Sequence, residues 1–267
     1  MPRTLLGVAG FPVSHSRSPA MHNAALAEQG LDDWLYVPLP LPPERFAETV
    51  RALPASGFRG LNVTVPHKLA AHELADRHTA AAAAIGAANT LTFIDGEIEA
   101  DNTDAGGFLD ALATSPQGLR VLVLGAGGSA RAIVWALRQG GAAEVSIWNR
   151  TPERAAELAQ AMGVRHAERP EPADILVNCT SVGLDPTTTV ADAREALGLL
   201  GAAPAATVVD LVYGTGPTPF VQWARGGGAR VVEGLDVLVS QGARSLERWT
   251  GTASPIDTMR MAAQGQS

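Results

Sequence analysis

The sequence predicts an α/β protein of two domains, because of its composition and two separate alternations of strands and helices. At 267 residues, 46% hydrophobic and 18% charged, the chain has enough apolar side chains for two moderate cores. The first alternation ends at a predicted hairpin, and the second begins at Arg120. We expect one domain at residues 1–103 plus 236–267 and the other at residues 104–235.

The N-terminal third alternates short apolar runs with helical stretches. Strands are predicted at 4–9, 34–38, 58–65, 90–94 and 97–100, and helices at 18–29, 43–53, 66–76 and the alanine run 80–84. The dipeptide Asp95-Gly96 favours the two-residue turn of a hairpin. Ser18 before Pro19 joins an N-cap side chain to the residue suited to the first helical position, so Ser18 is the predicted cap.

The second alternation has continuous β-branched and leucine runs, which are typical of parallel strands covered by helices on both faces. Strands are predicted at 120–124, 144–148, 175–177, 207–211 and 230–232. One helix runs to about Gln139, and Thr151-Pro152 starts another. The segment from Asp236 onward is helical again, carries Ser240-Gln241, and is expected to pack back onto the first domain.

Charge and cysteine content argue against several classes of protein. A net charge of -7 disfavours binding to nucleic acid, which needs a basic surface. No apolar run is long enough to span a bilayer, and residues 1–10 read as a strand rather than a signal peptide. A single cysteine, Cys179, excludes disulfides within the chain and multi-thiolate metal sites. We expect a cytoplasmic protein without a metal ion.

A glycine-rich loop follows the predicted strand 120–124. Its residues are Gly125, Ala126, Gly127, Gly128, Ser129 and Ala130. Between a strand and a helix, such a loop turns backbone N–H groups toward a pyrophosphate, as in Rossmann-like domains that bind dinucleotides. The glycine pattern alone also fits a tight turn, so the residues further along decide between the two.

The end of the strand 144–148 indicates which dinucleotide is bound. Domains that bind NAD usually carry an acid about 20 residues after the loop. This sequence has Asn149, Arg150 and Thr151 instead, with Arg154 one helical turn later. A carboxylate would repel a 2′-phosphate, whereas guanidinium groups and short polar side chains bind it. We therefore expect NADP(H), against the alternative that both arginines are ordinary surface charges.

Two turns of the N-terminal domain are candidate substrate contacts. Ser16 and Ser18 lie before a helix start, where hydroxyls and free N–H groups suit a small carboxylate. Helix capping accounts for one serine but not both. Lys68 falls on the first turn of a predicted helix, whose positive end disfavours an ammonium ion and so favours proton transfer. A lone lysine is more often solvated, but the polar helix start at 102–104 and the polar pair 89–90 after a helix of small residues favour the functional interpretation.

With these motifs in one order, the chain resembles the shikimate dehydrogenase family over nearly its whole length. The motifs lie at 12–19, 62–68, 88–90, 102–104 and 125–128, and the resemblance continues through 149–151, 178–181, 210–213 and 234–236 to Gln241. The resemblance implies an N-terminal α/β substrate-binding domain, a Rossmann-like NADP-binding domain and a C-terminal helix that returns to the first domain.

The resemblance also implies residue roles. Lys68 and Asp104 would be the catalytic pair that moves the hydroxyl proton during NADP-dependent interconversion of shikimate and 3-dehydroshikimate. The substrate contacts implied are Ser16, Ser18, Thr64, Lys68, Asn89, Asp104, Tyr213 and Gln241. The cofactor contacts implied, besides the glycine loop, are Asn149, Arg150, Thr151, Arg154, Thr180, Ser181, Val212 and Gly234.

Three alternatives stay open at this point. A paralogue acting on quinate or aminoshikimate would keep the same catalytic pair, and one buried polar contact more or less can change that specificity. A non-catalytic NADPH sensor would be expected to lack Lys68 or Asp104, and both are present. A folate-dependent dehydrogenase of similar build fits the serine-rich turn less well. The expected assembly is a monomer or a homodimer.

Overall fold

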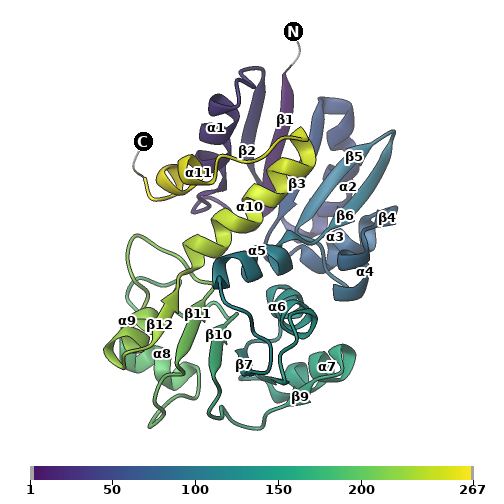
Figure 1. Cartoon of the computed structure of the whole chain (residues 1–267). Coiled ribbons are helices and arrows are strands. Elements are labelled where there is room, and N and C mark those ends of the chain that lie inside the picture. Colours follow the sequence, from purple (N-terminus) through teal and green to yellow (C-terminus); the bar gives the residue numbers. More distant parts are fainter. Residues whose placement is uncertain (1–2, 266–267) are drawn as a thin grey trace. The chain divides into compact units, whose positions relative to one another are not determined.

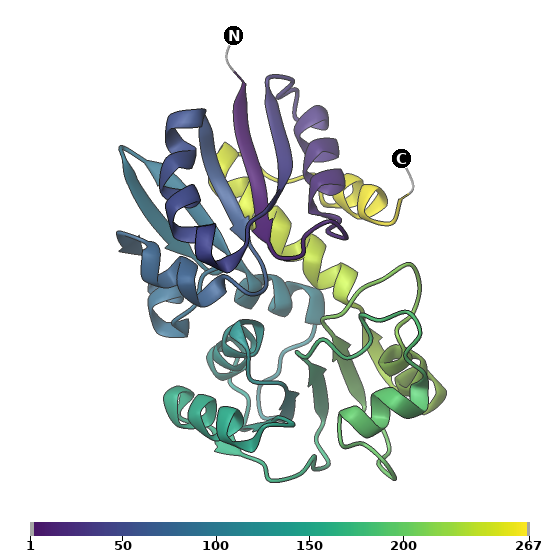
Figure 2. The same cartoon turned by 180° about the vertical axis from the view of Figure 1, so that it is seen from behind.

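The structure is a computed structural model that describes residues 3–265 and divides into two compact units. The first unit comprises Met1–Gly107 and Leu238–Ser267, and the second comprises Phe108–Val237. Each unit has its own six-stranded sheet, and Figures 1 and 2 show the two sheets from opposite sides. Among residues 3–265, no helix has both the length and the apolar character needed to cross a membrane.

The sheet of the first unit is mixed. Its order is β2-β1-β3-β5-β6-β4, with bounds β1 (Thr4–Gly10), β2 (Trp34–Pro40), β3 (Phe58–Val63), β4 (Arg77–His78), β5 (Thr90–Ile94) and β6 (Glu97–Asp101). Strand β1 pairs in parallel with β2 and β3, while β5 runs antiparallel to both β3 and β6. The hairpin between β5 and β6 turns at Asp95 (φ 52°) and Gly96 (φ 85°), as its sequence predicts.

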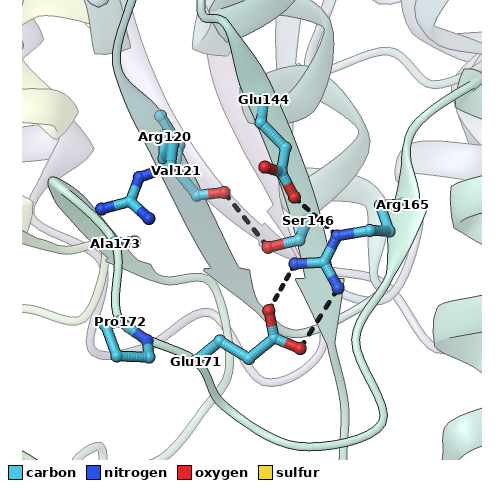
Figure 3. A pocket seen from close by; sticks show the side chains of 8 residues that line it. All are labelled: Arg120, Val121, Glu144, Ser146, Arg165, Glu171, Pro172 and Ala173. Carbon is cyan, nitrogen blue, oxygen red and sulfur yellow. Dashed lines mark hydrogen bonds and ion pairs between the residues drawn. The ribbon is translucent and has the colours of Figure 1, made fainter.

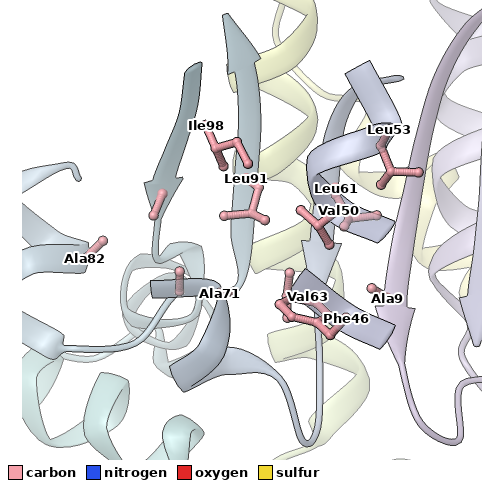
Figure 4. Packing of buried hydrophobic residues seen from close by; sticks show 12 residues of the cluster. Ala9, Phe46, Val50, Leu53, Leu61, Val63, Ala71, Ala82, Leu91 and Ile98 are labelled. Atoms are coloured by element: carbon pink, nitrogen blue, oxygen red, sulfur yellow. The ribbon is translucent and has the colours of Figure 1, made fainter. Parts of the chain in front are cut away.

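Helices cover both faces of this sheet. On one face lie α1 (Ser18–Glu28), α10 (Gly234–Thr250, from Leu238 on) and α11 (Ile256–Ala263), and on the other lie α2 (Phe46–Ala52), α3 (Lys68–Leu74) and α4 (Ala80–Ile85). Phe46 and Val50 of α2 pack against Leu61 and Leu91 of the sheet (Figure 4). On the α10 face, Gly60 leaves room for Trp249, whose Nε1 would lie 2.1 Å from a Cβ there.

The sheet of the second unit is entirely parallel. Its order is β12-β11-β10-β7-β8-β9, with bounds β7 (Arg120–Leu124), β8 (Glu144–Trp148), β9 (Arg165–His166), β10 (Ile175–Asn178), β11 (Thr207–Asp210) and β12 (Arg230–Val232). Its helices are α6 (Gly128–Gln139), α7 (Pro152–Met162), α8 (Val190–Ala196) and α9 (Pro219–Gly226). Helix α5 (Thr103–Leu112) begins in the first unit and ends in the second.

Two predicted helix starts differ in their capping. Helix α1 begins at Ser18 itself and Arg17 occupies the N-cap position, so the prediction of a Ser18 cap is wrong. The chain turns into the helix one residue earlier than the Ser-Pro pair indicates. Thr151 does occupy the N-cap of α7, but its side chain makes no capping hydrogen bond. Neither the Ser18 nor the Thr151 side chain therefore caps its own helix.

Candidate active site and nucleotide-binding loops

Lys68 and Asp104 form an ion pair in the first unit. Lys68 Nζ lies 2.6 Å from Asp104 Oδ2, and the two side chains are only 12% and 14% exposed. Charges withdrawn from water this far are stable only when they are paired and hydrogen-bonded. The pair therefore holds two opposite charges at one point while leaving a small part of each open to a ligand.

The local folding of the chain places each member of the pair. Lys68 is the first residue of α3, and its carbonyl oxygen accepts a hydrogen bond from Ala88 N at 2.8 Å. Asp104 lies in the first turn of α5, where the positive end of the helix favours a carboxylate. The backbone thus fixes where both side chains start, and the helix dipole stabilises the carboxylate.

Asn89 connects this pair to the rest of the unit. Its Nδ2 donates to Asp104 Oδ1 at 2.8 Å and to Gln241 Oε1 at 3.0 Å. Its Oδ1 accepts from Thr103 N at 2.8 Å. Because a backbone N–H only donates, this contact fixes which end of the amide is the oxygen. Asn89 is 2% exposed, so Asp104 receives a charge-assisted bond that little water can replace.

Gln241 reaches this cluster because α10 comes very close to α5. A Cβ on Gly107 would lie 2.5 Å from Gln241 N, a distance that no side chain allows. The glycine therefore permits the backbones to approach, and Gln241 is 8% exposed. The structure brings Lys68, Asn89, Asp104 and Gln241 into one connected group, as needed for the roles that the sequence predicts for them.

Ser16, Ser18 and Thr64 belong to the same unit but to neighbouring turns. Ser18 N donates to Ser16 Oγ at 3.3 Å, directly at the start of α1. Thr64 follows β3, and its N–H donates to the Ala9 carbonyl oxygen at 2.8 Å. Two polar turns thus carry these residues, one between β1 and α1 and one after β3. The carboxylate-binding role of the two serines stays a prediction.

Buried polar residues that the sequence analysis assigned no role lie behind Asn89. They are Tyr36, Asn62, Thr90, Thr103 and Ser245. One signal could have found Ser245: it lies four residues after Gln241 on a predicted helix, and so on the same face. Asn62, Thr90 and Thr103 lie in the quoted motifs, but hydroxyl and amide side chains there read equally well as turn residues.

The glycine loop of the second unit is shaped by close backbone contacts on one side and is open on the other. Gly125 has φ 111°, and its N–H donates to the Trp148 carbonyl oxygen at 2.8 Å. A Cβ on Gly125 would lie 3.1 Å from the Cys179 backbone. Gly127 precedes α6, and nothing lies within 4 Å of where its Cβ would be. The open side fits a pyrophosphate at the helix start.

The turn after β8 carries no carboxylate and two exposed guanidinium groups. Asn149 Nδ2 donates to the Thr151 carbonyl oxygen at 3.0 Å, which shapes the turn. Arg150 and Arg154 are exposed. This donor set, at the carboxyl end of a parallel strand beside the glycine loop, fits a 2′-phosphate.

A buried carboxyl group links the next two loops of the second unit. Asp210 accepts hydrogen bonds from Asn178 Nδ2 at 2.9 Å, Val212 N at 3.1 Å and Thr218 Oγ1 at 2.5 Å. Asn178 Oδ1 in turn accepts from Thr180 N at 3.0 Å. Burial raises the pKa of Asp210 to about 6, although the three hydrogen bonds oppose that rise.

Through Asn178 and Val212, Asp210 holds two loops that carry predicted cofactor contacts. Thr180 and Ser181 follow Asn178 in one loop, and Val212 itself lies in the other, beside the predicted substrate contact Tyr213. Gly234 comes so close that its Cβ would lie 2.6 Å from the Val212 carbonyl oxygen. These loops leave the carboxyl ends of β10, β11 and β12, which is the edge where open parallel sheets bind ligands.

A shallow pocket lies at the opposite, amino-terminal edge of that sheet (Figure 3). Its lining includes Arg120, Glu144, Ser146, Arg165 and Glu171. Arg165 bonds Glu144 at 2.6 Å and Glu171 at 2.5 Å, and these carboxylates raise the pKa of the guanidinium. Arg120 pairs with Asp174 at 3.7 Å, so each charged group of the pocket already has a partner and we assign the pocket no ligand. Among residues 3–265, no group of three or more His, Cys, Asp and Glu side chains is placed to hold a metal ion.

Three family models match the chain in order. The model described as "Shikimate dehydrogenase substrate binding domain" matches residues 8–91. "Shikimate / quinate 5-dehydrogenase" matches residues 110–182, and "Shikimate 5'-dehydrogenase C-terminal domain" matches residues 234–264. The matched segments follow the same order as the predicted substrate-binding segment, glycine loop and returning helix.

Named relatives and solved structures are similar over almost the whole chain. "Shikimate dehydrogenase (NADP(+))" of Geobacter metallireducens is 43% identical and covers 96% of this chain and 94% of its own. The shikimate dehydrogenase structure from Aquifex aeolicus is 34% identical, with a TM-score of 0.89 and 98% of each chain covered. The Thermus thermophilus enzyme, in complex with NADP(H) and shikimate, is 38% identical with a TM-score of 0.86, covering 99% of this chain and 100% of its own.

Proposed function

The chain belongs to the shikimate dehydrogenase family, and we propose that Lys68 and Asp104 transfer the proton in its reaction. The reaction is the reversible NADP-dependent reduction of 3-dehydroshikimate to shikimate, a step on a CH–OH group. The observation that carries the residue assignment is the nearly buried 2.6 Å ion pair with Asn89 bound to its carboxylate.

The cofactor is NADP(H), and the second unit offers the residues to hold it. When bound, its nicotinamide ring accepts or donates the hydride. The backbone N–H groups after Gly125 would bind the pyrophosphate at the start of α6. Arg150 and Arg154 would bind the 2′-phosphate by charge-assisted hydrogen bonds, with Asn149 and Thr151 beside them.

Oxidation of the carbinol removes a hydride from its carbon and a proton from its hydroxyl oxygen. As shikimate is oxidised, the C–H bond breaks with both electrons leaving to the cofactor, and the hydroxyl proton passes to the Lys68–Asp104 pair as the carbonyl forms. In the reverse direction the pair returns that proton to the carbonyl oxygen. Because the two groups are joined by a 2.6 Å contact, we assign the proton to the pair and not to either residue alone.

Lys68 is the only lysine in the sequence, although the chain has 20 lysine and arginine residues together. The other residues of that set are therefore all arginines. A guanidinium group cannot release its proton in a protein, whereas an ammonium group can. The single lysine of the chain is the one in the ion pair with Asp104. This supports proton transfer at that position.

The remaining site roles are those that the resemblance to the family implies. We propose that Ser16 and Ser18 bind the substrate carboxylate and that Thr64, Asn89 and Gln241 bind ring hydroxyls. We propose Tyr213, in the loop after β11, as a further substrate contact. The expected compartment is the cytoplasm, and the expected assembly is a monomer or homodimer, which gel filtration measures.

The test is the formation of NADPH by the purified protein with shikimate or quinate against NADP or NAD, in all four pairings. We expect turnover only with shikimate and NADP. Turnover of quinate, or preference for NAD, would assign the protein to a paralogue with another substrate or cofactor. No turnover in any pairing would contradict the enzymatic assignment and favour an NADPH-binding sensor.

A further inference from the structure

A cluster of buried polar side chains lies behind Asn89, and we propose that it acts as a positioning set for Asp104, with Ser245 at its centre. The members are Tyr36, Asn62, Thr90, Thr103 and Ser245, all in the first unit. The inference rests on the proposed function, because it concerns how the proton-transfer pair is held. None of the five would touch the reacting atoms; they act through the Asn89 amide.

The contacts of Asn62 fix the direction of its amide. Its Nδ2 lies 3.2 Å from the Asn89 carbonyl oxygen, and a carbonyl only accepts, so this atom is the nitrogen. Asn62 Oδ1 therefore faces Tyr36, whose hydroxyl donates at 2.8 Å. Asn62 Nδ2 also donates to Ser245 Oγ at 2.9 Å. The Asn89 carbonyl oxygen thus determines that Ser245 meets a donor and not an oxygen, and the Tyr36 hydroxyl is compatible with that orientation.

Ser245 joins four elements through one hydroxyl. Besides the bond from Asn62 of β3, its Oγ lies 2.9 Å from Thr90 Oγ1 of β5 and 3.0 Å from Thr103 Oγ1 of α5. It also donates to the Gln241 carbonyl oxygen of its own helix α10 at 3.1 Å. The side chain is 0% exposed. A hydroxyl buried this completely is tolerated only because these partners satisfy it.

The set acts on Asp104 through the orientation of Asn89. Asn89 Oδ1 accepts from Thr103 N at 2.8 Å and from Thr90 Oγ1 at 3.0 Å. With its oxygen held there, the amide must present its nitrogen to Asp104 Oδ1. A turned amide would place a carbonyl oxygen against the carboxylate. Thr103 Oγ1 can donate to Ser245 Oγ, and Thr90 Oγ1 packs against the same oxygen at 2.9 Å, so Ser245 determines how firmly Asn89 donates to Asp104.

The experiment compares Ser245→Ala with Ser146→Ala. Ser146 is a matched control, since it is a buried serine of β8 in the second unit with one hydrogen bond of 3.4 Å. We expect Ser245→Ala to lower kcat for shikimate oxidation about tenfold and to change the KM for NADP by less than about twofold. In an Asn89→Ala background, the same substitution is expected to change kcat by less than about twofold.

A second readout uses the single lysine. In protein labelled with 15N at the lysine side chain, the amine signal comes from Lys68 alone. We expect Ser245→Ala to move this signal because Asp104, its partner at 2.6 Å, shifts. Ser146→Ala is expected to leave it in place. A purely structural role for Ser245 would lower the melting temperature without moving the signal.

The outcomes separate this inference from the proposed function. An unchanged kcat in Ser245→Ala, or a loss that adds in full to that of Asn89→Ala, would overturn the positioning role. If the wild-type protein turns over neither shikimate nor quinate, the proposed function fails instead. In that case the Lys68 signal still decides: a signal that Ser245→Ala does not move overturns the inference, and one that it moves supports it.

Discussion

Lys68 Nζ and Asp104 Oδ2 lie 2.6 Å apart although 36 positions separate them in the sequence. Each stands in the first turn of a helix, Lys68 in α3 and Asp104 in α5. The start of α5 stabilises the carboxylate, whereas the start of α3 disfavours the ammonium. The ammonium is therefore held chiefly by its partner, and the site is sensitive to any change in either side chain.

Replacement of Lys68 tests the proton-transfer role. Lys68→Ala is expected to lower kcat by about 10² to 10⁴-fold, because positioned acid–base groups contribute that much. The KM for NADP is expected to change little, because Lys68 belongs to the first unit and the cofactor contacts belong to the second. Steady-state kinetics of shikimate oxidation measure both constants.

Lys68→Arg is the sharper variant of this test. It keeps the positive charge beside Asp104 but removes the ability to release a proton. We expect it to be nearly as inactive as Lys68→Ala. Arg45→Ala, which removes an exposed cation of the same unit, serves as the control. A Lys68→Arg enzyme with wild-type kcat would show that the site needs only the charge.

Replacement of Arg150 tests the choice of cofactor. Arg150→Ala is expected to raise the KM for NADP about tenfold, because it removes a charge-assisted bond to the 2′-phosphate. The KM for NAD, which lacks that phosphate, should stay close to the wild-type value. Kinetics with both cofactors at constant ionic strength measure the ratio. Equal losses with the two cofactors would mean that Arg150 does not contact the 2′-phosphate.

Much of the fold could be predicted from the sequence, because its local signals agree with its packing. The strands Arg120–Leu124, Glu144–Trp148 and Arg230–Val232 lie at their predicted positions, since continuous apolar runs suit a sheet covered on both faces. The Asp95-Gly96 hairpin was equally predictable. The family, the fold class and the NADP cofactor predicted from the ordered motifs are confirmed by relatives such as the 43% identical one.

The contacts that hold the site residues in place were less predictable from the sequence, for a physical reason. The importance of Ser245 depends on three partners that come from β3, β5 and α5, and no local pattern reports such contacts. Gly107 is similar, because its small size matters only through the approach of Gln241. The two-residue β4, Arg77–His78, carries no periodicity at all. The roles of the site residues themselves stay predictions until they are measured.

Replacement of Gly107 tests the approach of α10 to α5. Gly107→Ala places a Cβ 2.5 Å from Gln241 N, so the two helices must separate. We expect a fall in kcat of about tenfold or more, because a displacement of about 1 Å in a site of this kind costs that much, together with a lower melting temperature. Kinetics and thermal unfolding of the purified variant measure both effects.

Gly226→Ala is the matched control for Gly107→Ala. Gly226 also lies in a helix, α9, but nothing lies within 4 Å of its Cβ position. Alanine there is expected to leave kcat unchanged and to raise the melting temperature slightly, because it has the higher helix propensity. Equal activity in the two variants would mean that Gln241 does not depend on the close approach at Gly107.

The buried carboxyl group of Asp210 predicts an unusual dependence of stability on pH. Its pKa is about 6 in the folded protein, raised by burial from 3.8. The folded state therefore holds this proton more tightly than the unfolded state, so the group costs stability as the pH rises from about 4 to about 6. Above that range the cost is constant. The difference between the two values corresponds to about 3 kcal/mol of unfolding free energy.

Asp210→Asn removes that titration and can keep three hydrogen bonds, the one with Thr218 in the reverse direction. The amide oxygen of the variant can accept from Asn178 Nδ2 and Val212 N. Its amide nitrogen can donate to Thr218 Oγ1, because a hydroxyl oxygen also accepts hydrogen bonds. We expect the variant to gain stability over the wild type as the pH rises from about 4 to about 7, by up to about 3 kcal/mol. Urea unfolding of both proteins across this range measures the difference. Parallel curves would mean that Asp210 titrates in the folded protein as it does in the unfolded chain.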